Sequence, residues 1–375
     1  MKKIVLCTFF SKHSGGLESH FSSLKKYLES RILNNVVDSV EEIKMSKKKN
    51  KLKIFKFFLK NIMYIYNFEI FKNKILQGLY KDQVHKSLLN DKGIIYHFHD
   101  VLSLYALKEL KKNNRFILTV HGPLSRESKM MFPKNIGYYK YLKRIEKEAY
   151  KLADKIITVD SGQKDILLND YCIDERKITV IFNGVDSDEF YFSSIEKNYF
   201  LVPRRLVKKN GVHIAILAFN EIEKINLKIA GDGVEMENLK KLVEKLGIKN
   251  KVEFLGDIDR KNIKKLILEA KGVIIPSIPS SGVIEATSIS ALEAMSAGKI
   301  VIASRIGGLE ELIKNGENGI LFEAGDYREL AKLINESLKN EKKRLEIGSK
   351  ARKFILENNC LKIWGDKILK VYYES

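Results

Sequence analysis

Short apolar runs alternate with helical patterns along the whole 375-residue chain, in two successive series. Such alternation is typical of strand–helix–strand units, which build parallel sheets covered by helices. The predicted strands of the first series are Ile4–Phe10, Gly93–Phe98, Phe116–Val120, Lys155–Val159 and Ile178–Phe182. Those of the second are Tyr199–Val202, Asn226–Ala230, Val252–Leu255, Val273–Ile275 and Ile300–Ala303. The sequence therefore predicts an α/β protein with two Rossmann-like parallel sheets.

The length also favours two domains, because a chain of this size exceeds one ordinary hydrophobic core. The strand pattern is interrupted between Asp186 and Asn198. We therefore place the first domain at residues 1–195 and the second at residues 196–355. Ligands of such folds bind at the carboxyl ends of the strands. Two facing sheets would leave a cleft with one substrate on each wall.

Cysteine usage and hydropathy bear on where the protein works. The three cysteines are few, odd in number and far apart, so they indicate neither a disulfide framework nor a metal site. No run reaches the roughly 18 uncharged apolar residues that a membrane span needs. Ile4–Phe10 mimics a short signal peptide, but no small-residue cleavage site follows it, so a buried strand is the preferred interpretation. We expect a cytoplasmic protein.

The formal net charge of +20 calls for an anionic partner. Residues 1–195 carry +13 of it, and Lys44–Lys60 holds eight lysines and no acid, followed by aromatic and aliphatic residues up to Phe71. A basic amphipathic stretch of this kind can lie on an anionic membrane surface, here as a peripheral protein on its inner face. The alternative is a solvated helix with its apolar face in the core. Charge alone also allows nucleic acid, but no recognition motif supports it, so we expect none.

Two glutamates follow the strand predicted at Val273–Ile275, Glu285 in a loop and Glu293 in a helix. Amides at the start of a helix bind anions, and carboxylates accept hydrogen bonds from sugar hydroxyls. The pattern therefore favours a phosphorylated, hydroxyl-rich ligand. A structural alternative stays open for Glu293, because Ser290 and Glu293 also fit a capping box. The residues between the two acids that we expect at this site are Thr287, Ser288 and Ile289.

This stretch resembles the donor-site signature of glycosyltransferase family 4, retaining enzymes of the GT-B architecture, in which two glutamates precede a helix. The segments 298–313 and 315–322 resemble the family as well. One difference is Ala286–Ser288, where many members have a glycine-rich loop. The resemblance implies two Rossmann-like domains whose parallel sheets face a central cleft. It also implies that the last helix, about residues 356–375, packs back on the first domain.

Further residues match family motifs. Arg205 and Lys209 resemble the family's Arg-Leu and Lys-Gly motif, which holds the donor diphosphate and assists its departure. Asn210 separates Lys209 from Gly211 here, so the register stays open and Arg204 is the alternate arginine. Without the resemblance, this segment could be an exposed basic turn. The remaining matches are Gly16 in a Gly-Gly-x-Glu loop, His121 near the transferred sugar, and Gly231 in a turn near the nucleotide base. His99 ends a strand as His121 does, and a histidine there could hydrogen-bond a sugar hydroxyl or act as a proton shuttle.

By resemblance, the chain is a retaining glycosyltransferase that moves a sugar from a nucleotide-sugar donor on the second domain to a glycan or lipid-linked acceptor on the first. The expected pathway is cell-surface polysaccharide or glycolipid synthesis. Glu285 would hold the hydroxyls of the transferred sugar, and Glu293 the nucleotide ribose. The departing phosphate would deprotonate the acceptor hydroxyl, with no protein nucleophile.

We expect neither metal nor cofactor. Asp257-Ile258-Asp259 has the spacing of a metal-binding pair, but it precedes a helix, where a capping aspartate is ordinary. Two alternatives stay open for the function. One is another GT-B enzyme, such as a retaining phosphorylase or a sugar-nucleotide epimerase. The other is a non-enzymatic basic protein that binds membrane or nucleic acid.

Overall fold

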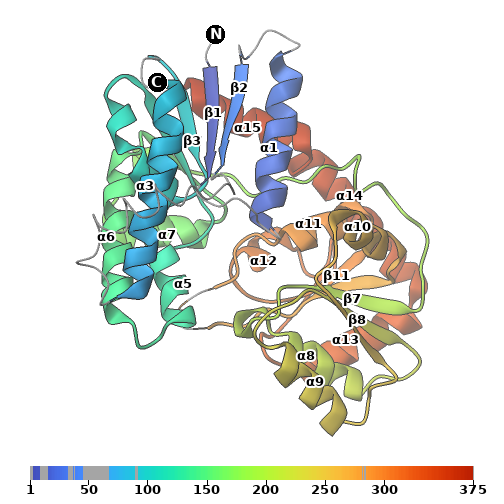
Figure 1. Ribbon diagram of the computed structural model, residues 1–375. Helices are drawn as coiled ribbons and strands as arrows, with labels where there is room; N and C mark the ends of the chain where they lie inside the picture. Colours follow the sequence, from blue (N-terminus) through green and yellow to red (C-terminus); the bar gives the residue numbers. More distant parts are fainter. Residues whose placement is uncertain are drawn as a thin grey trace. The chain divides into compact units, whose positions relative to one another are not determined.

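The computed structural model describes residues 3–8, 16–32, 37, 39–44, 67–88, 92–280, 282 and 284–374. The chain forms two compact units (Figure 1). Unit 1 comprises residues 1–181 and 365–375, and unit 2 comprises residues 182–364. Each unit is built on one six-stranded parallel sheet with helices on its faces. The predicted α/β fold with two Rossmann-like sheets is confirmed.

In unit 1 the strand order is β2-β1-β3-β4-β5-β6. The strands are β1 (Lys3–Thr8), β2 (Ser39–Lys44), β3 (Ile95–Phe98), β4 (Arg115–Val120), β5 (Lys155–Thr158) and β6 (Ile178–Val180). Among the described residues the helices are α1 (Gly16–Ile32), α3 (Phe68–Leu88), α4 (Val101–Ala106), α5 (Leu124–Met131), α6 (Ile136–Leu152), α7 (Ser161–Tyr171) and, from Gly365 onward, α15 (Leu361–Tyr373). The described part of the unit also contains the 3-10 helices η2 (Lys108–Asn113) and η3 (Glu175–Lys177).

The core of unit 1 follows from the two-residue period of its strands, which sends alternate side chains to opposite faces. Tyr96 and Phe98 of β3 point to the face covered by α3, α4 and α6, where they share a cluster with Tyr80 and Leu142. From Gly365 onward, helix α15 belongs to this unit although it comes last in the sequence. A side chain at Gly365 would collide with the Tyr27 ring of α1, 2.4 Å from the nearest ring carbon. The glycine therefore allows α1 and α15 to pack closely.

In unit 2 the strand order is β12-β11-β10-β7-β8-β9. The strands are β7 (Tyr199–Pro203), β8 (Asn226–Ala230), β9 (Val252–Gly256), β10 (Gly272–Ile275), β11 (Ile300–Ser304) and β12 (Ile320–Phe322). The helices are η4 (Lys208–Asn210), α8 (Val212–Asn220), α9 (Met236–Lys245), α10 (Arg260–Glu269), α11 (Ile289–Ser296), α12 (Gly307–Leu312), α13 (Tyr327–Lys339) and α14 (Glu341–Asn358). Ile274 packs with α8 and α13, whereas its neighbours Val273 and Ile275 pack with α10 and α11.

Each sheet has a point at which the strand order reverses. In unit 2 the chain runs outward from β7 through β8 to β9, and then returns to place β10 on the other side of β7. In unit 1 the reversal lies between β1 and β3. Ligands of open α/β sheets bind beside the carboxyl ends of the strands at such a point. Ligand sites are therefore expected at the loops after β7 and β10 in unit 2, and beside the start of α1 and after β3 in unit 1.

The division between the units lies at residue 182, earlier than the linker expected between Asp186 and Asn198. Backbone and side-chain packing explain the difference. The Val185 amide donates to the Asn359 carbonyl at 2.9 Å, and Phe190 is fully buried in the core of unit 2. Residues that interrupt the strand pattern therefore still pack as part of the second unit.

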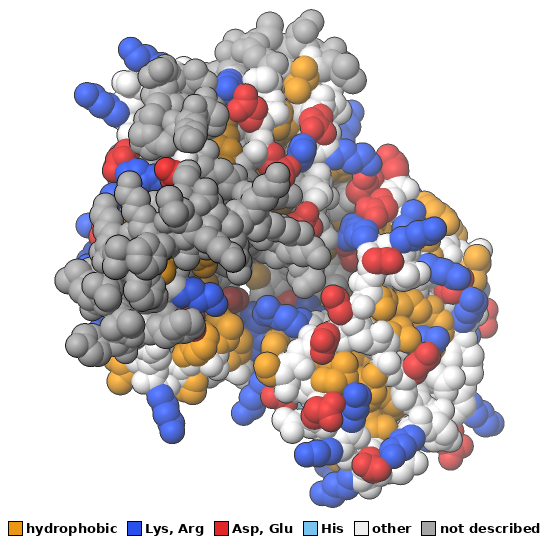
Figure 2. Space-filling view, in the orientation of Figure 1, with side chains coloured by type: hydrophobic (Ala, Val, Ile, Leu, Met, Phe, Trp, Pro, Cys, Tyr) orange, Lys and Arg blue, Asp and Glu red, His pale blue; other side chains and the backbone are white. Residues whose placement is uncertain are grey.

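Charged side chains of both signs lie on the same face of the molecule (Figure 2). Figure 2 shows Lys and Arg side chains spread over the visible face and interspersed with Asp and Glu. The basic stretch Lys44–Lys60 lies outside the described residues, apart from the backbone of Lys44 at the end of β2. Its contact with a membrane stays a prediction. Among the described helices, none is both long enough and apolar enough to cross a bilayer.

Candidate functional site

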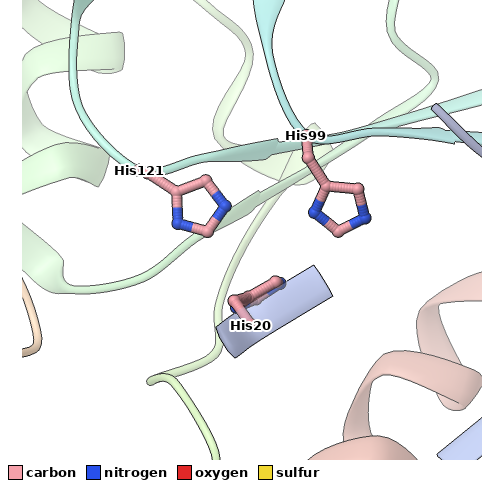
Figure 3. Close-up of side chains that lie close together, drawn as sticks. All are labelled: His20, His99 and His121. Carbon is pink, nitrogen blue, oxygen red and sulfur yellow. The ribbon is translucent and has the colours of Figure 1, made fainter. Parts of the chain in front are cut away.

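Three histidines come together in unit 1 (Figure 3). His20 lies on α1, His99 directly follows β3 and His121 directly follows β4. Their ring centroids are 5.2 Å apart for His20 and His99, 4.6 Å for His20 and His121, and 6.2 Å for His99 and His121. The sequence singled out His99 and His121 as strand-end residues, but it gave no separate signal for His20.

A fourth histidine, His97, supports this group from inside the sheet. Its Nδ1 is 2.7 Å from the Tyr372 hydroxyl of α15, and its Nε2 is 2.7 Å from the Thr119 hydroxyl of β4. Burial lowers the pKa of His97 to about 3, with a smaller contribution from His20. His97 is therefore neutral at physiological pH, and its ring packs on His99 with centroids 4.4 Å apart.

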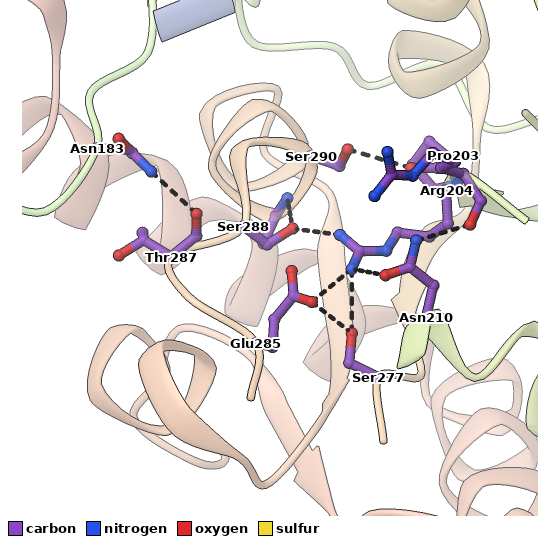
Figure 4. Close-up of polar contacts among 11 residues, drawn as sticks. Asn183, Pro203, Arg204, Asn210, Ser277, Glu285, Thr287, Ser288 and Ser290 are labelled. Atoms are coloured by element: carbon purple, nitrogen blue, oxygen red, sulfur yellow. Dashed lines mark hydrogen bonds and ion pairs between the residues drawn. The ribbon is translucent and has the colours of Figure 1, made fainter. Parts of the chain in front are cut away.

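Arg204 is the centre of a polar cluster in unit 2, at the carboxyl end of β7 (Figure 4). Its Nη2 donates to Glu285 Oε2 at 2.6 Å, to Asn210 Oδ1 at 2.7 Å and to Ser277 Oγ at 3.2 Å. Its Nη1 donates to Ser288 Oγ at 3.2 Å. The side chains of Arg204 and Glu285 are only 11% and 10% exposed, so this is a largely buried ion pair. The pair lies where the strand order reverses.

Arg204, the alternate arginine of the sequence motif, is thus the one that pairs with Glu285. The side chain of Arg205 is exposed, and its backbone carbonyl accepts a 2.6 Å hydrogen bond from Asn210 Nδ2. Lys209 is partly exposed, and its carbonyl accepts from the Ile278 amide at 2.8 Å. Asn210, which stands directly before Gly211, is buried between the two arginines. The sequence treated Asn210 only as an interruption of the motif, and its role in holding Arg204 was missed.

The loop that carries Glu285 is held by a pair of glycines after β11. The Gly308 amide donates to the Glu285 carbonyl at 3.0 Å. A Cβ atom at Gly308 would lie 2.7 Å from the Thr287 amide nitrogen, and one at Gly307 would lie 2.3 Å from the Glu285 carbonyl oxygen. Asn183 Nδ2 donates to the Thr287 carbonyl at 3.0 Å. The Gly-Gly sequence therefore lets two backbone segments meet and fixes the position of Glu285.

Two further glycines allow close backbone packing around Arg204 and Pro276. Gly231 follows β8, and a Cβ atom there would lie 2.1 Å from the Arg204 carbonyl oxygen. Gly211 has a φ of +59°, and a Cβ atom there would lie 1.8 Å from the Pro276 carbonyl oxygen. Gly231, expected near the nucleotide base, thus also has a packing reason to be glycine. Gly211 joins the loop after β7 to the loop after β10.

Helix α11 begins at Ile289, and its cap corrects one sequence interpretation. Ser288 is the N-cap residue, with its hydroxyl accepting from the Ala291 amide at 3.4 Å. The capping box between Ser290 and Glu293 is therefore wrong, because the helix starts before Ser290 and Glu293 lies beyond its first turn. The Ser290 hydroxyl instead donates to the Pro203 carbonyl at 3.2 Å. Thr287 and Ser288 are both buried beside this helix start.

Glu293 is paired with Arg260, the first residue of α10. Arg260 Nη1 donates to Glu293 Oε1 at 2.5 Å, while its Nε and Nη2 reach Glu189 at 3.1 and 2.9 Å. Burial raises the pKa of Glu293 to about 7, although Arg260 acts in the opposite direction. Arg260 was not predicted as a site residue from the sequence. Asp259 caps α10 by accepting from the Asn262 amide at 2.8 Å, as its place before the helix suggested.

Two other predicted site residues, Gly16 and Ile289, lie at the starts of helices. Gly16 is the first residue of α1, the helix that carries His20, and Ile289 is the first residue of α11. The structure thus gathers the predicted residues into two groups, one within each unit. The unit 2 group contains Arg204, Glu285 and the start of α11, with Glu293 further along the same helix. The unit 1 group contains His121 with His20 and His99.

Comparison with known proteins gives two matching family descriptions. "Glycosyl transferases group 1" matches residues 187–354, and "Glycosyltransferase Family 4" matches residues 74–189. An uncharacterized glycosyltransferase of Methanocaldococcus jannaschii is 29% identical over a match that covers 94% of this chain and 93% of that protein. The O-antigen chain mannosyltransferase of Salmonella typhimurium is 28% identical over a match that covers 56% of this chain and 62% of that protein. The solved structure of Anabaena HepE in complex with UDP-glucose has a TM-score of 0.72 at 18% identity and 99% coverage of both chains.

Proposed function

The chain belongs to the group 1 glycosyltransferases and has their GT-B fold, and we propose that it transfers a sugar, with retention of configuration and without a metal ion, from a nucleotide-sugar donor to a glycan or lipid-linked acceptor. The observation that carries the proposal is the buried Arg204–Glu285 pair beside the start of α11. It places a cation, a carboxylate and helix amides together at the reversal of strand order. A nucleoside diphosphate sugar has groups that match all three.

Arg204 and the start of α11 would hold the donor diphosphate. As the bond to the sugar breaks, negative charge grows on the leaving phosphate, and fixed donors aimed at that charge lower the barrier. An arginine fork binds phosphate oxygens in pairs, and helix amides add further donors. Glu285 holds Arg204 in place through Oε2. In this proposal the same carboxylate accepts hydrogen bonds from hydroxyls of the transferred sugar.

Glu293 would accept hydrogen bonds from the nucleotide ribose. Its partner Arg260 is held by Glu189 and stacks on Phe190, 4.9 Å from the ring centroid. Arg260 therefore keeps a positive charge beside Glu293, which favours the ionised carboxylate. Only the ionised form offers acceptors on both oxygens.

The raised pKa of Glu293 predicts how donor binding depends on pH. The folded-state value of about 7 exceeds the ordinary 4.5, so protonated Glu293 contributes stability that is lost as pH rises through about 7. The ionised acceptor appears over the same range, so we expect the donor KM to fall between about pH 6 and pH 8. Glu293→Gln should remove this dependence. Parallel pH profiles of wild type and variant at constant ionic strength would contradict the assignment.

The acceptor side of the proposal depends on the basic, aromatic stretch that starts at Lys44. A relative named for O-antigen synthesis supports an acceptor of the cell-surface glycan class. We propose that the stretch brings the chain to an anionic membrane surface, where a lipid-linked acceptor would lie. Replacing the lysines of 44–60 by glutamine should weaken binding to anionic vesicles in a sedimentation assay. Equal binding of this variant and wild type would refute the membrane contact.

A donor screen tests the central proposal. UDP-, GDP- and ADP-sugars are incubated with the chain, with and without EDTA, and slow hydrolysis to the free nucleotide is measured. We expect turnover of a UDP-sugar, since a structural neighbour was solved with UDP-glucose. Activity should survive EDTA, and complete inactivation would contradict the metal-free mechanism. Conversion of the sugar without nucleotide release would indicate an epimerase, dependence on orthophosphate a phosphorylase, and no turnover of any donor a binding protein.

A further inference from the structure

The histidine cluster in unit 1, defined as His20, His99 and His121, has the composition of a metal site, and its ring nitrogens lie close enough for small side-chain movements to bring them to one ion. One ring nitrogen from each residue can be chosen so that all three lie within 4.8 Å of one another. We propose that the histidine cluster binds one divalent transition-metal ion of the class that prefers imidazole, with Zn²⁺ as its physiological example. Figure 3 shows that the three rings approach from three different elements.

The geometry requires only small side-chain movements. Zinc binds histidine nitrogen at about 2.0–2.1 Å, so tetrahedral ligands lie about 3.4 Å from each other. From the observed spacing, each nitrogen would move inward by less than about 1 Å, which rotations about the side-chain bonds can supply. The centroid separations of 4.6, 5.2 and 6.2 Å bracket the value of about 5.2 Å that three tetrahedral imidazoles would have.

The surroundings would hold these ligands in place. His99 and His121 directly follow adjacent strands of the sheet, β3 and β4, which pair in parallel register. The His99 ring also packs against the rings of Phe21 and His97, with centroid separations of 5.0 Å and 4.4 Å. His97 is itself fixed by Tyr372 and Thr119. Metal sites depend on such outer contacts, because they orient the ligands that touch the ion.

The kind of ligand selects the kind of ion. Neutral imidazole nitrogens favour Zn²⁺, Co²⁺, Ni²⁺ and Cu²⁺, whereas Mg²⁺ and Ca²⁺ prefer oxygen. The histidine cluster therefore differs from a magnesium site for a donor diphosphate. His20 and His99 are buried, but His121 is partly exposed. A water molecule can then complete the coordination as fourth ligand, as in zinc sites with three protein ligands.

Occupation of the site would have a consequence for catalysis, and this step rests on the proposed function. His121 is expected beside the transferred sugar. An ion that holds its ring nitrogen would withdraw it from that role, so Zn²⁺ should inhibit transfer and EDTA should restore it. Inhibition at one equivalent of Zn²⁺ supports this role. Zn²⁺ that binds at one equivalent and leaves donor hydrolysis unchanged overturns it.

Metal binding is tested without any donor, so its result does not depend on the proposed function. The full chain is titrated with Co²⁺, whose visible absorption reports tetrahedral coordination, and then with Zn²⁺ as competitor. We expect one equivalent to bind. His20→Gln and His99→Gln should each weaken binding by more than about 100-fold, since even the loss of an outer contact costs up to that much. His213→Gln is the matched control, because His213 lies on α8 in unit 2.

Two results would overturn the site. One is the absence of saturable binding of Co²⁺ or Zn²⁺ by wild type. The other is unchanged binding in the His20→Gln and His99→Gln variants. Circular dichroism shows whether each variant is folded. If either fails to fold, X-ray absorption of the wild-type zinc complex counts the ligands directly. Three imidazole nitrogens support the site, and fewer than three refute it.

Discussion

Replacement of Arg204 by alanine is expected to lower kcat/KM for the donor by about 10²- to 10³-fold, the loss typical of removing one fixed donor to developing charge. The Arg204 guanidinium is largely buried and is held by Glu285, Asn210, Ser277 and Ser288. This pre-set orientation means that little reorganisation is needed when the phosphate departs. Initial rates of donor hydrolysis at several donor concentrations measure the effect.

Two further variants separate charge from geometry. Arg204→Lys keeps a positive charge but loses the planar fork, so most of the activity should still be lost. Arg204→Ala also leaves Glu285 buried without its cation, which costs about 3–5 kcal/mol of stability. Folding of both variants must therefore be checked, and Arg204→Lys is the cleaner one for activity. Arg328→Ala, an exposed arginine on α13, is the control for general charge loss.

The neighbouring arginine gives the sharpest comparison. The sequence motif favours Arg205, whereas the contacts favour Arg204. If Arg205→Ala reduced kcat/KM more than Arg204→Ala, the exposed arginine would be the one that meets the diphosphate. The assignment of Arg204 would then be wrong, although the site as a whole would stand.

Replacement of Gly211 by alanine is expected to lower the free energy of unfolding of unit 2 by about 2–5 kcal/mol. Its φ of +59° costs an L-residue about 1–2 kcal/mol. The added Cβ would also lie 1.8 Å from the Pro276 carbonyl oxygen, and overpacking of this kind costs about 1–3 kcal/mol more. Because Gly211 joins the loops that hold Asn210 and Ser277, donor binding should weaken as well.

Unfolding can be followed by the fluorescence of the single tryptophan, Trp364, which is buried in unit 2. Gly247→Ala is the matched control. Gly247 has a similar φ of +69°, but a Cβ atom there would meet nothing within 4 Å. The free energy of unfolding of Gly247→Ala should therefore fall only by the backbone cost of about 1–2 kcal/mol. If Gly211→Ala and Gly247→Ala lost equal free energy of unfolding, the contact with Pro276 would not be the cause of the instability of Gly211→Ala.

Much of the fold could be predicted because its signals are local. Buried parallel strands are short apolar runs, and β8 was predicted at its observed limits, Asn226–Ala230. The edge strand β2 was missed, because Ser39–Lys44 carries two glutamates and a lysine in six residues and lacks an apolar run. It forms a strand because it pairs with β1 in parallel.

The candidate site could be predicted in part. Glu285 and Glu293 stand in one continuous motif, so the sequence identified both. Their partners Arg204 and Arg260 are 81 and 33 positions away, and nothing local connects them. The capping box was wrong for a local reason, because Ser288 and Ser290 are equally good caps and backbone geometry selects between them.

By itself, the sequence determined the two series of strands, the family resemblance and the acids of the proposed donor site, since each is recorded within a few neighbouring residues. Only the tertiary structure decided that Arg204 rather than Arg205 meets Glu285. Only the structure brought His20 to His99 and His121. The physical reason is the same in both cases. The order of strands in the sheets determines which loops meet, and the backbone of each loop determines which of two adjacent side chains points inward.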